Sequence, residues 1–258
     1  MRILAIESAQ TTVSVAVAEE AAGEKAEEAA DVRRVLGEYT VNGTKDHSQT
    51  LLPAVELLCA RLGLELSTLD AVAVSGGPGS FTGLRIGSAT AKGLAYSLDI
   101  PVVHVPTPDL LAYGIAGTDA LICPLLDARN RRVFTGLYHF RECFEVVRPA
   151  FAAGIEELAD LLNEIGETVF FTGDGIPAAK ELLDAALTVP HRYAPAHLAF
   201  PRASAAALLA LDYAAAGKTV SAAEEVPDYL RASQAEREFE KRTGMTVEEA
   251  ARRARTEA

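Results

Sequence analysis

The residues best suited to bind a small ligand lie in one glycine-rich run, Ser75-Gly-Gly-Pro-Gly-Ser-Phe-Thr-Gly-Leu-Arg-Ile-Gly. It follows an apolar stretch, Ala71–Val74, that is typical of a buried strand, and it leads into Ser88–Ser97, which is typical of a helix. A glycine-rich turn between a strand and a helix can bring backbone N–H groups close to an anion. The run therefore has two interpretations, an anion site and a purely structural turn.

The details of the run favour the structural turn. Leu84 and Arg85 follow Gly83, so the Gly-Lys-Ser/Thr ending of a Walker A phosphate loop is missing. Ser80 is not framed as the Gly-x-Ser-x-Gly of a nucleophile elbow, and it or Thr82 is well placed to cap the helix.

No other set of residues predicts catalysis. The five histidines form neither His-x-x-x-His nor His-Glu-x-x-His, so a metal site is not predicted. Asp127 and Asp174 each follow a predicted strand, where functional residues often lie. Gly173-Asp174-Gly175 is equally typical of a turn, however, and we favour the turn.

The helix after the glycine run carries a second pattern. Gly83, Gly87, Ala91 and Ala95 recur every four residues and so share one helical face. A row of small side chains allows another helix to approach closely. That helix can belong to the same lobe or to a partner chain, and the spacing does not decide between them.

The composition argues against several classes of protein. The 258 residues carry a formal net charge of −12, which argues against unaided binding of nucleic acid. We expect no membrane span, because no run reaches 18 apolar residues, and no signal peptide, because the first apolar run is short and resembles a strand. Three scattered cysteines are typical of reduced thiols, and we expect a cytoplasmic protein.

The predicted elements give an α/β fold with mixed sheets and flanking helices. Arg2–Ser8 and Thr12–Ala18 predict a hairpin, and Arg33–Val41 a further strand. His47–Leu62 predicts a helix with one apolar stripe. The second half repeats this style, which suggests a duplicated lobe. Its predicted elements are strands at Ala120–Leu126, Arg132–Tyr138, Cys143–Val147 and Val169–Thr172, and helices at Ile155–Ile165, Ala178–Ala186 and Ala203–Ala216.

The glycine run, continued by Ala91-Lys-Gly-Leu-Ala, closely resembles the bacterial TsaB (YeaZ) family. Three further segments agree with this resemblance: the opening hairpin, His47-Ser-Gln-Thr-Leu-Leu-Pro, and Leu126-Asp-Ala-Arg together with Tyr229-Leu-Arg. The resemblance covers nearly the whole chain and implies the two-lobed fold of actin, Hsp70 and sugar kinases. We place the N-terminal lobe at 1–106, with partner-binding helices at 47–62 and 82–97, the C-terminal lobe at 107–232 and a charged helical tail at 233–258.

The family resemblance also implies a function. TsaB is a paralogue of TsaD, which transfers a threonylcarbamoyl group to the adenosine beside the tRNA anticodon. TsaD holds its metal through a His-x-x-x-His segment, whereas the matching region here, Val103–Leu111, contains His104 alone. The implied role is therefore a non-catalytic accessory and dimerization subunit that scaffolds and activates TsaD. It has no cofactor of its own, because ATP and metal belong to the partner subunits.

The implied partners are TsaD and the ATPase TsaE, with a homodimer when TsaD is absent and contact to tRNA only through the complex. We expect the pairing surface on the two N-lobe helices, and Gly87→Leu to abolish pairing while the monomer stays folded. The predicted interface residues are Leu51, Val55, Leu58, Gly83, Leu84, Gly87, Ala91 and Ala95. The alternatives are an active metal-dependent threonylcarbamoyltransferase or peptidase-like ATPase, a relative of sugar or acetate kinases, and a protein that binds tRNA alone.

Overall fold

The computed structural model describes residues 1–21, 32–43 and 46–229, and the single residues 239, 242, 243, 245 and 249. Residues 1–228 form one compact unit and 229–258 a second. The predicted tail at 233–258 lies almost entirely outside the described residues, as do residues 22–31, which are rich in alanine and glutamate. The predicted lobe boundary after Pro106 falls inside the first unit and stays a prediction.

The first of two sheets has the strand order β3-β2-β1-β4-β5. Its strands are β1 Arg2–Glu7, β2 Val13–Ala21, β3 Val32–Val41, β4 Ala71–Gly77 and β5 Val102–Pro106. β1, β2 and β3 pair antiparallel, whereas β1, β4 and β5 run parallel. The predicted hairpin and mixed sheet are thus confirmed.

Both faces of this sheet are covered, because side chains alternate along each strand. Leu4 and Ile6 lie in one apolar cluster with residues of α1 His47–Leu62 and α2 Phe81–Leu98. Ile3 and Ala5 lie in the opposite cluster, with residues of α3 Thr107–Tyr113 and α6 Ala203–Ala215. The two helices that the sequence analysis selected for partner binding therefore share one face of the sheet.

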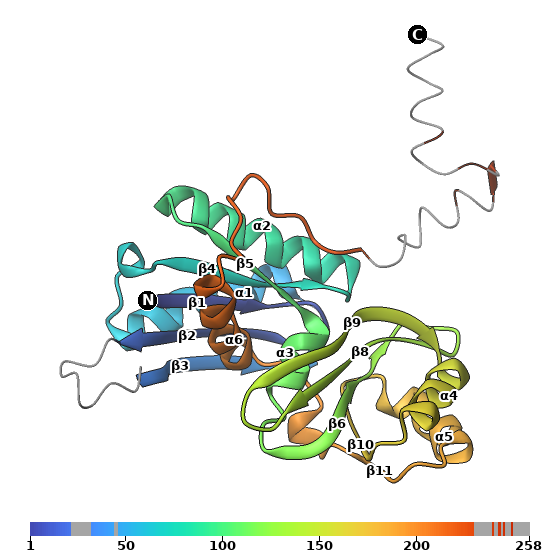
Figure 1. Cartoon of the computed structure of the whole chain (residues 1–258). Coiled ribbons are helices and arrows are strands. Elements are labelled where there is room, and N and C mark those ends of the chain that lie inside the picture. Colours follow the sequence, from blue (N-terminus) through green and yellow to red (C-terminus); the bar gives the residue numbers. More distant parts are fainter. Residues whose placement is uncertain are drawn as a thin grey trace. The chain divides into compact units, whose positions relative to one another are not determined.

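Helix α6 packs on the first sheet although it follows the second sheet in the chain. Figure 1 shows it lying across β1, β2 and β3. Small residues meet at this contact: Ala5, Ala16 and Ala73 of the strands share a cluster with Ala206 and Ala210 of the helix. Short side chains on both surfaces allow the helix to lie close to the strands.

The first turn of α6 is capped from another strand. No side chain caps the helix from the N-cap position, Arg202. The Ser204 backbone N–H instead donates to Glu38 Oε1 of β3 at 2.9 Å. Arg202 donates to the other carboxylate oxygen. Burial opposes the charge of Glu38, but these hydrogen bonds outweigh it and lower the pKa of the carboxyl group. The Glu38 charge also lies at the favourable end of the helix dipole.

Glu38→Ala is expected to lower the free energy of unfolding by about 1–2 kcal/mol at pH 7, because it removes this cap and leaves the Ser204 N–H unpaired. Urea unfolding followed by circular dichroism measures the change. Glu181→Ala, at an exposed position of α5 Ile176–Ala186, is the control and should stay within about 0.5 kcal/mol of the parent. Equal values for the two variants would contradict the capping role.

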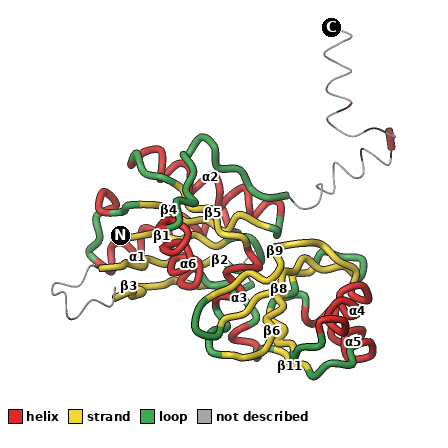
Figure 2. The backbone as a smooth tube through the Cα atoms, viewed as in Figure 1, coloured by secondary structure: helices red, strands yellow, loops and turns green. Residues whose placement is uncertain are grey.

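The second sheet has the order β11-β10-β6-β8-β7, and β9 pairs antiparallel with β8 from Arg132 to Phe140. Its strands are β6 Thr118–Pro124, β7 Leu126–Asp127, β8 Arg132–Phe140, β9 Phe144–Gly154, β10 Val169–Thr172 and β11 His191–Tyr193. Helix α4, Ile155–Ile165, and α5 pack together beside this sheet (Figure 2). β9 is longer than predicted, β11 was not predicted, and two 3₁₀ turns lie at Leu66–Thr68 and Ala196–Leu198.

One buried carboxylate ties the two sheets together. Asp109 of α3 accepts hydrogen bonds from Tyr138 of β8 at 2.7 Å and from Tyr213 of α6 at 2.5 Å. Burial raises the pKa of Asp109 despite these bonds. Because α6 packs on the first sheet and β8 belongs to the second, this contact fixes the position of one relative to the other.

Candidate functional site

The carboxyl ends of the parallel strands meet between the two sheets, which is where ligands usually bind in α/β proteins. The first sheet contributes the turn after β1 and the glycine run after β4. The second contributes the turn after β10 and the start of β7. We call the place where these four segments meet the junction.

The glycine run is held against the turn after β1. The Ser80 N–H donates to the Ala9 carbonyl at 2.6 Å, and the Ser8 hydroxyl donates to the Gly83 carbonyl at 2.9 Å. A Cβ atom on Gly79 would lie 2.3 Å from the Ala9 carbonyl oxygen, and one on Gly83 2.1 Å from the Ser8 carbonyl oxygen. The chain's own backbone therefore occupies the space that these two glycines leave open.

The start of α2 is capped within this contact. Ser80 is the N-cap residue, and its hydroxyl accepts a hydrogen bond from the Gly83 N–H at 3.3 Å. This confirms Ser80 rather than Thr82 as the cap. The structural interpretation of the run is supported, because its geometry is explained by packing against the first hairpin.

A side-chain bridge connects the two sheets at the junction. Gln10 Nε2 donates to Asp174 Oδ1 at 2.9 Å, and the Asp127 N–H donates to the same oxygen at 3.3 Å. Gln10 is buried, and burial raises the pKa of Asp174. The turn around Asp174 is confirmed, and it also brings Asp127 and Asp174 together. His47 at the start of α1 contacts the Gln10 carbonyl through Nε2 at 2.7 Å.

Glu7 lies beneath this bridge and is fully buried. Its Oε1 accepts the Ala9 N–H at 2.8 Å, whereas Oε2 has no hydrogen-bond partner. Burial raises the pKa of Glu7 to about 7, and the neighbouring carboxylate of Asp174 adds to the increase. Burial therefore favours the protonated form of this carboxyl group, to which the sequence assigned no role.

The predicted interface residues lie inside the chain. Leu51, Val55 and Leu58 pack in the core beneath α1. On α2, Gly87 faces Ser8 and Val74, with a Cβ position 2.2 Å from the Ser8 hydroxyl. The other predicted positions are equally buried: Gly83, Leu84, Ala91 and Ala95. The close approach that Gly83 and Gly87 allow is made by the turn after β1 and by β4 of the same chain, not by a partner helix.

His104 and Gly76 form a second contact that the sequence did not reveal. The His104 ring lies where a side chain on Gly76 would be, at 1.9 Å from its Cβ position. Its nitrogens lie 3.1 Å from Asp228 and 3.7 Å from Glu225. Burial disfavours the charged ring, but these carboxylates raise the pKa of His104 to about 9. Lys92 of α2 donates to the Glu225 carbonyl at 2.7 Å, so this cluster fastens residues 225–228 onto α2 and β4.

The connection from β7 to β8 has an unusual backbone. Arg129, Asn130 and Arg131 all have positive φ values, of 63°, 56° and 57°. We call these three residues the arch. Left-handed backbone costs about 1–2 kcal/mol at each residue with a side chain, although asparagine tolerates it better than arginine. This conformation could not be predicted from the sequence, because a left-handed turn is usually marked by glycine and none is present here.

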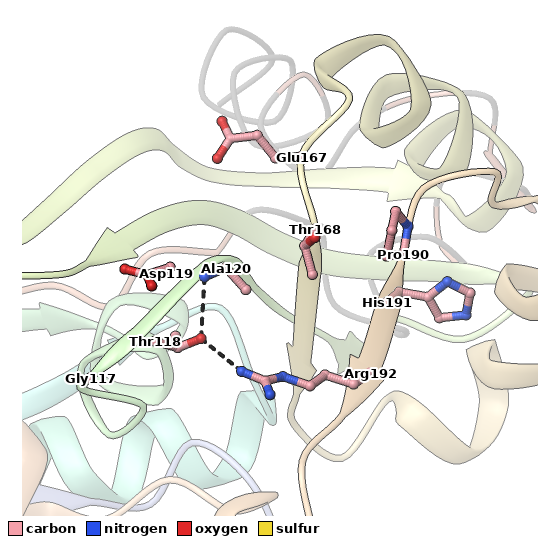
Figure 3. Close-up of a pocket in the computed structure, with 9 residues that line it drawn as sticks. All are labelled: Gly117, Thr118, Asp119, Ala120, Glu167, Thr168, Pro190, His191 and Arg192. Carbon is pink, nitrogen blue, oxygen red and sulfur yellow. Dashed lines mark hydrogen bonds between the residues drawn. The ribbon is translucent and has the colours of Figure 1, made fainter.

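A surface pocket of about 500 Å³ lies at the opposite, amino ends of β6, β10 and β11 (Figure 3). Arg192 crosses it and donates to Thr118 Oγ1 at 3.0 Å, and its guanidinium also lies over Phe170. The Arg192 guanidinium therefore already has partners within the chain. Among the residues that line this pocket, no nucleophile is paired with a base.

The described residues contain neither a cluster of metal ligands nor a membrane-spanning helix. Nowhere in residues 1–21, 32–43 and 46–229 do three His, Cys, Asp or Glu side chains come close enough to hold a metal ion. No helix in the described part of the chain is long and apolar enough to cross a membrane.

Comparison with known proteins gives a consistent result. Residues 34–239 match the family "TsaD: tRNA N6-adenosine threonylcarbamoyltransferase". The chain is 34% identical to the tRNA threonylcarbamoyladenosine biosynthesis protein TsaB of Bacillus subtilis, over 92% of this chain and 96% of that protein. It is 28% identical to the Escherichia coli protein of the same name, over 90% and 95%.

A solved structure has a similar fold. YeaZ from Pseudomonas aeruginosa is similar over 89% of this chain and 99% of that chain, with a TM-score of 0.70 and 27% sequence identity.

Proposed function

Since this chain belongs to the TsaB family of tRNA threonylcarbamoyladenosine biosynthesis proteins, we propose that it is the accessory subunit that pairs with TsaD and activates it. The observation that carries the proposal is the exposed surface of α1 and α2. TsaE joins this pair, tRNA is bound by the complex, and ATP and metal are held by the partner subunits. A homodimer forms through the same surface when TsaD is absent.

The pairing surface proposed here differs from the buried set that the sequence suggested. Large apolar side chains are exposed on both helices: Leu52 is 55% exposed, Leu57 45% and Tyr96 82%. α1 and α2 contact each other on one face of the first sheet. Ala89 and Gly93 are exposed residues in the interior turns of α2. These five residues, Leu52, Leu57, Ala89, Gly93 and Tyr96, are the outer face.

Gly93 is the most informative residue of the outer face. Nothing lies within 4 Å of the position that its Cβ would take, so no contact within the described chain requires glycine there. A glycine in the middle of a helix costs about 1 kcal/mol relative to alanine. A partner helix that approaches closely would explain why the position has no side chain.

The junction supports a non-catalytic role. The chain's own groups fill it, because Gln10 reaches across to Asp174 and the glycine run lies against Ala9. A ligand at the carboxyl ends of these strands would have to displace the Gln10–Asp174 bridge.

Gly93→Arg is expected to abolish pairing with TsaD while leaving the monomer as stable as the parent or more so. Arginine is the better helix former, and its side chain would occupy the outer face. Size-exclusion chromatography measures pairing, and thermal unfolding measures stability. Ala178→Arg, at an exposed position of α5, is the matched control and should pair normally. Normal pairing by Gly93→Arg would contradict the proposed surface.

Reconstitution tests the function itself. Cognate TsaD, TsaE, tRNA, ATP and a threonylcarbamoyl donor are assayed for modification with and without this protein. We expect modification only when it is present, and none from this protein alone. The match to the TsaD family gives a second candidate, an active threonylcarbamoyltransferase, which modification by this protein alone would support. Modification that does not depend on this protein would exclude both.

A further inference from the structure

The arch combines backbone strain with an exposed concentration of positive charge. Arg129, Arg131 and Arg132 fall within four residues, and all three are exposed at the surface. The side chains of Arg129 and Arg131 are 83% and 65% exposed. The whole chain has a net charge of −12, so this concentration of arginine runs against its overall charge.

The fold explains where the arch lies but not which side chains it carries. The backbone is anchored on both sides: the Ile155 N–H donates to the Arg131 carbonyl at 3.1 Å, and the Arg132 N–H to the Arg129 carbonyl at 3.2 Å. Glycine would make the same backbone bonds without strain. Strained backbone of this kind clusters at functional sites, so an observed outlier supports a hypothesis of function.

The acidic residues around the arch hold its arginines only weakly. Arg131 pairs with Glu156, which is itself 54% exposed, and Arg129 lies 3.5 Å from Asp127. The third acidic neighbour, Asp174, is engaged by Gln10 and by the Asp127 N–H. Exposed ion pairs of this kind contribute little to stability, and an external anion can replace them.

We propose that the arch contacts the sugar–phosphate backbone of the RNA that the complex modifies. This inference rests on the proposed function, because the acidic chain would not attract RNA unaided. The planar guanidinium group binds phosphate through paired N–H donors, and such contacts position RNA without reading its sequence. Three successive left-handed residues point neighbouring side chains in different directions, which suits contact with more than one phosphate.

Two double variants separate the side chains from the strain. Arg129→Gly with Arg131→Gly removes both charges and relieves the backbone, whereas Arg129→Gln with Arg131→Gln removes the charges alone. Both should weaken binding of unmodified tRNA to the reconstituted TsaD complex about tenfold at 0.15 M salt. Both should also reduce the slope of log Kd against log salt concentration by about 2. Only the glycine pair should also raise the melting temperature, by about 2 °C or more.

Arg141→Gln with Arg148→Gln is the matched control. It removes two exposed arginines outside the arch, one from the β8–β9 turn and one from β9, and should leave affinity and salt dependence unchanged. Binding is measured by fluorescence anisotropy of labelled tRNA, and assembly of the complex by size-exclusion chromatography.

Each outcome is decisive. Unchanged affinity and salt dependence in an intact complex would overturn the role of the arch and leave the proposed function standing. Loss of TsaD or TsaE from the complex of either arch variant would show that the arch contacts an acidic protein surface, and would also overturn it. Failure of the parent protein to assemble with TsaD would overturn both proposals.

Discussion

Gly83→Ala is expected to destabilise the protein by at least about 3 kcal/mol, a fall in melting temperature of roughly 10 °C. The added methyl group would lie 2.1 Å from the Ser8 carbonyl oxygen, and real Cβ atoms essentially never come within 3.0 Å of another heavy atom. The obstacle is backbone rather than a flexible side chain. Either α2 or the turn after β1 must therefore move, and that movement disrupts the Ser8–Gly83 hydrogen bond.

Gly93→Ala provides the matched control for this prediction. It is the same substitution in the same helix, but nothing lies within 4 Å of the new methyl group. We expect Gly93→Ala to raise the free energy of unfolding by about 1 kcal/mol through helix propensity. Thermal and urea unfolding of the two variants should give changes of opposite sign, and a fall of less than 1 kcal/mol for Gly83→Ala would contradict the packing described for the glycine run.

The same contact revises the expectation for Gly87→Leu. Loss of pairing with an intact monomer requires an exposed Gly87, but this residue is buried against Ser8 and Val74. Leucine at that position is expected to destabilise the monomer, so a loss of pairing would carry no information about the interface. Gly93→Arg tests pairing without this complication, because position 93 is exposed.

Glu7→Gln is expected to raise the free energy of unfolding above neutral pH. Its effect there should be more favourable than its effect in acid by about 3 kcal/mol. Burial raises the pKa of Glu7 from its ordinary value of 4.5 to about 7. Between these two values the folded protein keeps a proton that the unfolded chain has released. The unfolded state then binds fewer protons, so the stability of the parent falls as the pH rises. Glutamine is neutral throughout and can still accept the Ala9 N–H.

The measurement is the free energy of unfolding of parent and variant in urea at pH 5 and pH 8. The difference, variant minus parent, should grow by about 2–3 kcal/mol between these values. Glu38→Gln is a control of opposite sign, because hydrogen bonds lower the pKa of Glu38 and its charge stabilises the fold as the pH rises. If the unfolding free energies of Glu7→Gln and the parent differ by the same amount at both pH values, the raised pKa of Glu7 is contradicted.

The sequence predicted the elements well because their patterns are local. The period-two alternation of Val13, Val15 and Val17 specifies a strand whatever lies beside it. The apolar stripe of His47–Leu62 specifies a helix with one buried face, and α1 has those bounds. β11 was missed because it is only three residues long, and such a strand depends on its pairing with β10 more than on its own sequence.

The candidate site was harder to predict because spacing identifies a face and not the neighbour that covers it. Gly83 and Gly87 do share a face of α2, but only the fold shows that Ser8, 75 residues away from Gly83, occupies it. The Gln10–Asp174 bridge joins residues 164 positions apart, and neither residue type suggests the contact. The strain of the arch is also invisible in sequence, because no glycine marks it.

The position of α6 has a consequence for synthesis on the ribosome. The first sheet is encoded by residues 2–106, but one of its faces is covered only in part, by α3, until residues 203–215 have been made. The second sheet, encoded entirely within that interval, can form while the first is still incomplete. Vectorial folding, in which the N-terminal portion of a nascent chain folds first, is thus limited for this protein. Until α6 has been made, the apolar side chains of β1 and β2 that it covers in the folded protein lack this partner.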